Sequence, residues 1–114
     1  MSTVETHIRP WYVMPLSTLA GMFLANGLPH MLAGPLILRL PTPFSGGPGT
    51  LSSPMVNVLW GLSNIAIGLL LVRALRPWAS SKAPRLAVAL GAAGFLVFLT
   101  WAIGSLPLPD RFAP

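Results

Sequence analysis

Apolar residues gather in three long runs, which are separated by one stretch of turn-forming residues and one short basic stretch. The runs cover residues 12–33, 55–75 and 86–106. At roughly 1.5 Å per residue each would make an α-helix of about 30 Å, the thickness of the hydrocarbon core of a bilayer. The pattern predicts an all-α integral membrane protein, with three transmembrane helices in a single membrane domain spanning residues 1–114.

The first run contains a proline far from its start. Pro29 has no backbone N–H, and its ring clashes with the carbonyl four residues earlier, at Ala25. An interior proline is the commonest cause of a sharp bend in a helix. We therefore expect the first transmembrane helix to be kinked at Pro29.

The two connections differ in character. Residues 39–54 hold most of the strong turn formers, so they predict a Gly/Pro-rich loop between the first two helices. Ser53 and Pro54 suit the N-cap and first position of the second helix, which we expect to begin at Met55. Residues 73–85 predict a short basic connection whose charges are Arg73, Arg76, Lys82 and Arg85.

The number and positions of the charged residues predict a membrane environment and an orientation in it. Hydrophobic residues make up 54% and charged residues only 8%, and the net charge is +5. Because the basic residues lie at the ends of the apolar runs, they indicate orientation and contact with anionic lipid rather than nucleic acid. Arg9 and the basic connection outweigh Arg39 and Arg111, which predicts a cytoplasmic N-terminus, an outside C-terminus and a place in the bacterial cytoplasmic (inner) membrane.

Small and polar residues mark the faces expected to pack. Asn57, Gly61, Asn64 and Gly68 recur at i, i+4, i+7 and i+11, which places them on one face of the second helix. Small residues let helix backbones approach, and buried amides need partners, so this polar stripe should face protein. Gly91 and Gly94 are expected to serve the same purpose on the third helix.

Polar groups from separate runs fall at one expected depth, in the outer half of the membrane. They form a candidate ligand site of Asn26, His30, Asn57 and Asn64. His30 has two interpretations. The functional interpretation is a ligand for a metal or pigment, or a proton carrier. The structural interpretation is a neutral imidazole that bonds to Asn26 or Asn57 and ties two helices together. The structural interpretation is favoured, because a metal needs three or four ligands and the outer half offers no Asp, Glu, Cys or second His.

Catalytic chemistry has little support. Both acidic residues, Glu5 and Asp110, lie in the terminal tails, and the chain contains no cysteine. A Ser-His-acid triad or a carboxylate pair is therefore excluded from the apolar runs. We expect no catalytic residue, no metal site unless at His30, and no bound cofactor.

Several segments together resemble a family of short, uncharacterised bacterial membrane proteins. They are the Asn-Gly-Leu-Pro-His segment at 26–30, Pro-Thr-Pro-Phe at 41–44, Ser53-Pro54 and Asn-Val-Leu-Trp-Gly at 57–61. The resemblance covers residues of about 20 to 70. It implies a bacterial inner-membrane protein and supplies no activity.

Two functions remain open from the sequence. One is a non-enzymatic membrane protein that packs through its polar and glycine faces, as a homo-oligomer or as an accessory subunit of a larger membrane complex. The alternative is a membrane protein that binds a ligand, pigment or metal around His30, as a small transporter or an enzyme subunit. The first is favoured because the polar stripe is present and catalytic acids are not.

Overall fold

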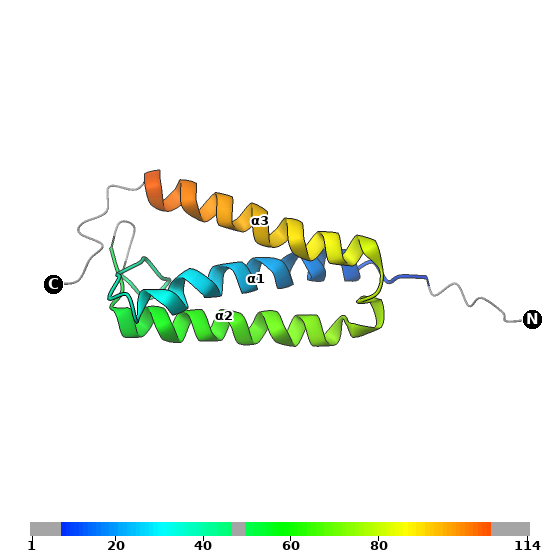
Figure 1. Cartoon of the computed structure of the whole chain (residues 1–114), viewed down its shortest axis with the longest axis horizontal. Helices are drawn as coiled ribbons and strands as arrows, with labels where there is room; N and C mark the ends of the chain where they lie inside the picture. The colour runs from blue at the N-terminus through cyan, green and yellow to red at the C-terminus, as the bar shows by residue number, and fades with distance from the viewer. Residues whose placement is uncertain (1–7, 47–49, 106–114) are drawn as a thin grey trace, which may run out of the picture.

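The chain folds into helices alone throughout the part that the structure describes. The structure is a computed structural model, and it describes residues 8–46 and 50–105. Its elements are α1 (Val13–Ala33), α2 (Pro54–Ala74), a short 3₁₀ helix η1 (Arg76–Trp78) and α3 (Lys82–Ser105) (Figure 1). The predicted all-α class is confirmed.

The three long helices lie side by side in a row with α1 in the middle (Figure 1). α1 contacts both of its neighbours extensively, whereas α2 and α3 make few contacts with each other. α3 diverges from α1 towards its C-terminal end, so the row is tighter where α2 and α3 are connected than at the opposite end (Figure 1).

Local chemistry explains where the helices start and end. Ser53 caps α2 because its hydroxyl accepts a hydrogen bond from the backbone N–H of Val56 at 3.2 Å, and Pro54 occupies the first helical position. α1 remains one helix past Pro29 to Ala33, one residue shorter at its start than predicted. The kink at Pro29 stays a prediction.

The basic connection is shorter than the predicted residues 73–85. α3 begins at Lys82 rather than Leu86, because Pro84 falls within its first turn, where a backbone N–H has no partner inside the helix. η1 occupies most of the remaining link between α2 and α3. The helix thus begins four residues before the predicted span of 86–106, and Pro84 lies inside its first turn.

Two of the helices are long and apolar enough to cross a membrane. They are α2 and α3, and only 22% and 11% of their apolar windows are buried inside the structure, unlike a core helix of a soluble protein. α1 does not meet the same criterion. Three transmembrane helices are thus not established by apolar character alone.

Glycines provide the close contacts between the helices. The buried residues of α2 are the four of the polar stripe, which faces α1. The spacing predicted that this face contacts protein, and the protein it contacts is the chain's own first helix. Gly61 approaches the backbone of Gly27, Gly68 approaches Leu24, and Gly91 approaches the backbone of Thr18.

Gly94 does not take the packing position predicted for it within the chain. A Cβ atom built on Gly94 would meet no atom within 4 Å. Gly94 lies further along α3 than Gly91, and α3 diverges from α1 in that direction (Figure 1). The packing prediction therefore holds for Gly61, Gly68 and Gly91 and is not met for Gly94.

Candidate functional site

A buried histidine and a buried asparagine form the centre of the polar cluster between α1 and α2. His30 is 4% exposed and Asn57 is 0% exposed. The His30 Nδ1 and Asn57 Oδ1 atoms are 2.6 Å apart, which is a short hydrogen bond. The bond joins the end of α1 to the first turn of α2.

The side-chain amide of Asn57 also holds both ends of the loop that precedes α2. Its Nδ2 group donates to the backbone carbonyls of Leu40, Ser52 and Ser53, at 3.1, 3.2 and 3.0 Å. These donations fix the amide orientation, because a flipped amide would turn its oxygen towards three carbonyl oxygens. Oδ1 is therefore the acceptor, and Nδ1 of His30 must carry the proton that it donates.

Hydroxyl groups of the loop itself hold the part of the loop that the structure describes. The Thr42 and Ser52 hydroxyl oxygens are 2.6 Å apart, and the Ser45 hydroxyl donates to the Thr42 carbonyl at 2.6 Å. Phe44 packs edge to face on Trp60, with ring centroids 5.7 Å apart. The loop thus lies against the ends of α1 and α2 as a compact cover over the His30–Asn57 pair.

A second amide pair lies deeper between the same two helices. Asn26 Nδ2 donates to Asn64 Oδ1 at 3.0 Å, and Asn64 Nδ2 donates to the carbonyl of Trp60 at 2.8 Å. The four predicted site residues are therefore brought together as two hydrogen-bonded pairs. Their role in binding a ligand stays a prediction.

The backbone carbonyls of Leu40, Ser52 and Ser53, which accept from Asn57, could not be predicted from the sequence. The Pro-Thr-Pro and Ser-Ser-Pro segments indicated a turn and a helix cap, but periodicity carries no information about which carbonyl a loop presents to an amide. On α3, the Thr100 hydroxyl donates to the Leu96 carbonyl of the same helix at 2.8 Å.

An open cleft adjoins His30 on the side where α3 diverges from α1. Its volume is about 350 Å³. Most of its walls are apolar, and His30 and Thr100 supply the side-chain polar atoms. Its lining residues are Pro29, His30, Leu40, Leu96, Leu99, Thr100, Ile103 and Gly104.

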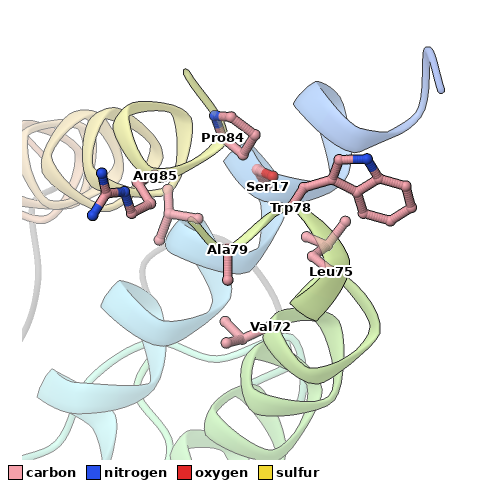
Figure 2. Close-up of a pocket in the computed structure, with 8 residues that line it drawn as sticks. Ser17, Val72, Leu75, Trp78, Ala79, Pro84 and Arg85 are labelled. Carbon is pink, nitrogen blue, oxygen red and sulfur yellow. The ribbon is translucent and has the colours of Figure 1, made fainter. Parts of the chain in front are cut away.

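A second hollow, of about 230 Å³, lies at the opposite end of the bundle, where η1 connects α2 to α3 (Figure 2). Figure 2 shows Val72, Leu75 and Ala79 on its walls, with the guanidinium of Arg85 extending away from them. Trp78 forms an edge-to-face pair with Tyr12 at 6.3 Å, which places two interfacial aromatic residues beside the hollow.

The basic residues at this end have no acidic partner in the described part of the chain, because Glu5 and Asp110 lie outside residues 8–46 and 50–105. Nor do the described residues contain a group of three His, Cys, Asp or Glu side chains able to hold a metal ion. The end of the bundle at η1 therefore carries cationic side chains, and the opposite end carries amide and imidazole side chains.

Comparison of the chain with protein-family models, with curated proteins and with solved structures gives no match. The function is therefore inferred from the geometry and the chemistry of the residues.

Proposed function

We propose that this chain is a three-span protein of the bacterial inner membrane, with its N-terminus in the cytoplasm and its C-terminus outside. The observation that supports it is the exposure of α2 and α3, whose apolar windows are only 22% and 11% buried. A surface of that kind needs lipid or another protein to cover it. α1, although less apolar, lies between these helices and is covered on both sides by them.

The same surface supports a non-enzymatic role in assembly, as a homo-oligomer or as an accessory subunit of a larger membrane complex. The polar stripe on α2 is not available for a partner, because it is buried against α1. The available surface includes the exposed Val97 and Trp101 of α3, and Gly94, in a hollow between α3 and α1, is open to close approach.

The mass of the purified protein in mild detergent tests this proposal. Multi-angle light scattering gives the protein mass free of bound detergent, for comparison with the 12.1 kDa of one chain. We expect an integral multiple of that mass or a stoichiometric co-purifying protein. A monomer that co-purifies with no other protein at any detergent concentration would contradict the assembly role.

Anionic lipid is the proposed partner at the basic end. Arg73, Arg76, Lys82 and Arg85 lie within one short segment, and each basic residue near a membrane surface adds about 1 kcal/mol of attraction to anionic lipid. The apolar hollow beside Arg85 has room for part of an acyl chain.

Phosphatidylglycerol should therefore be retained over phosphatidylcholine when the protein is purified from mixed nanodiscs. Replacing the four basic residues with Gln should abolish this preference. Equal retention of both lipids would contradict this partner.

A ligand site in the outer half is the second candidate function, and the observation that favours it is that buried His30 lines an open cleft. An absorption spectrum and metal analysis of the native preparation test the pigment and metal forms of this candidate. A colourless, metal-free preparation would restrict it to colourless organic ligands.

A further inference from the structure

We propose that the cleft between α1 and α3 binds an apolar molecule that carries a hydroxyl group, and that this hydroxyl donates a hydrogen bond to Nε2 of His30. The proposal rests on the second candidate function, a ligand site in the outer half. It names the ligand chemistry that the site accepts.

The first step is the state of the imidazole. Nδ1 is the donor to Asn57 Oδ1, because Asn57 Nδ2 is already committed to three backbone carbonyls. The described residues contain no carboxylate that could pair with a charged imidazolium, so we take the ring as neutral. A neutral ring protonated on Nδ1 has a lone pair on Nε2, which can only accept.

The second step is the direction of that lone pair. The two ring nitrogens point in nearly opposite directions, and Nδ1 is held on the α2 side by Asn57. The ring also lines the cleft, whose other wall is α3. None of the described residues donates a hydrogen bond to Nε2, although His30 is only 4% exposed. Arg39 Nε, and not His30 Nε2, is the fully buried side-chain atom without a partner in the described residues. Nε2 is therefore an acceptor that opens to the cleft and has no donor among the described residues.

The third step is the chemistry of the opposite wall. Thr100 also lines the cleft, and its hydroxyl donates its proton to the Leu96 carbonyl at 2.8 Å, so it can offer an occupant only an acceptor. A site with two acceptors requires a donor from its occupant. An acyl chain would fill the apolar part but would leave Nε2 without a donor, which costs free energy in an apolar site.

The remaining walls define the rest of the occupant. Leu96, Leu99 and Ile103 are apolar, and the cleft volume of about 350 Å³ is at the lower end of the range for small-molecule sites. Aryl and alkyl alcohols share the required chemistry, so the proposal covers both, and the experiment separates them.

The experiment uses the full chain in nanodiscs with ¹⁵N-labelled histidine. The chain has two histidines, so the His30 signals can be assigned with a His7→Gln variant. The probes are 4-octylphenol, 1-octanol and 4-octylanisole, the methyl ether that lacks the donor. We expect a saturable change in the Nε2 signal with the hydroxyl probes, and roughly ten-fold weaker binding of the ether, the value of about one hydrogen bond. Comparing the phenol with the alcohol identifies the preferred source of the hydroxyl.

A matched pair of variants locates the binding. Gly104 lines the cleft and Gly94 does not, yet a Cβ on either would meet no atom within 4 Å. Gly104→Leu should therefore fill the cleft and weaken phenol binding at least ten-fold, while Gly94→Leu should leave it unchanged.

Three results would overturn the proposal. If the ether binds as tightly as the phenol and Gly104→Leu weakens both, the site binds ligands but does not select a hydroxyl. If no probe changes the His30 signals, the ligand site itself fails. If the native preparation absorbs visible light and loses the absorption in His30→Leu, the occupant of the cleft is a pigment bound through Nε2.

Discussion

Gly27 and Gly61 face each other backbone to backbone across the contact between α1 and α2. A Cβ atom on Gly27 would lie 2.8 Å from the Gly61 carbonyl oxygen, and one on Gly61 would lie 2.7 Å from the Gly27 carbonyl oxygen. Neither backbone can move without separating the helices, so this pair sets how closely α1 and α2 approach.

Gly61→Ala should therefore destabilise the protein by about 1–3 kcal/mol, the usual effect of forcing extra volume into a packed contact. Gly94→Ala is the matched control, because an added methyl group there meets nothing and alanine favours helix by up to about 1 kcal/mol over glycine. The measurement is the free energy of unfolding in mixed micelles titrated with a denaturing detergent. Equal stability of the two variants would show that the close approach of Gly27 and Gly61 does not contribute to the free energy of unfolding.

Asn57 should matter more for the loop than His30 does, although the two are bonded to each other. Asn57→Leu removes the donations of the Asn57 amide to the carbonyls of Leu40, Ser52 and Ser53, and should cost about 1–3 kcal/mol. His30→Leu leaves those donations in place. Hydrogen exchange at the Ser52 amide, which bonds to the Leu40 carbonyl, should therefore accelerate in the Asn57 variant and change little in the His30 variant.

Ser63→Ala is the control for both substitutions, because Ser63 is exposed and bonds only to the carbonyl one turn back in its own helix. It should change stability by no more than about 0.5 kcal/mol. If the Ser52 amide exchanged at the wild-type rate in Asn57→Leu, the loop would be held by its own hydroxyl groups instead.

Asn26 and Asn64 should be energetically coupled. Their amides are bonded at 3.0 Å between α1 and α2, and interhelical hydrogen bonds in membrane proteins average about 0.6 kcal/mol and reach about 1.7. A double-mutant cycle with Asn26→Ala and Asn64→Ala should give a coupling energy in that range. Strictly additive effects of the two substitutions would mean that each amide is satisfied by other groups.

The proposed orientation can be tested with single cysteines, because the natural chain has none. Ser80→Cys lies in the connection between η1 and α3, and Thr50→Cys lies in the loop at the opposite end of the bundle (Figure 1). In spheroplasts, an impermeant maleimide should label the cysteine at 50 and reach the one at 80 only after lysis. The opposite labelling pattern would reverse the proposed topology.

Much of this arrangement follows from simple periodicity. The spacing of Asn57, Gly61, Asn64 and Gly68 was enough to predict the buried face of α2, because residues at these intervals share one side of a helix. Turn formers and a Ser-Pro cap located the loop and the start of α2 to within one residue. The sequence left Asn26 and Asn57 open as partners of His30, and the structure shows the bond to Asn57.

Other features required three-dimensional information. Periodicity could not distinguish Gly91 from Gly94, because only the divergence of α3 from α1 separates a packed glycine from an open one. It also could not show that the polar stripe is buried within the chain rather than against a partner. That outcome depends on α1 lying in the middle of the row, and the sequence carries no direct record of helix order in space.

For the proposed three-span protein, the central place of α1 has a consequence for how the chain enters a bilayer during synthesis. α1 is made first, yet it does not meet the criterion for a span that α2 and α3 meet, and these two helices are made later. Its side chains Asn26 and His30 gain their partners Asn64 and Asn57 only when α2 arrives. Stable insertion of the first helix is therefore completed by the second, so a ribosome stalled before residue 54 should expose a segment that the membrane does not yet retain.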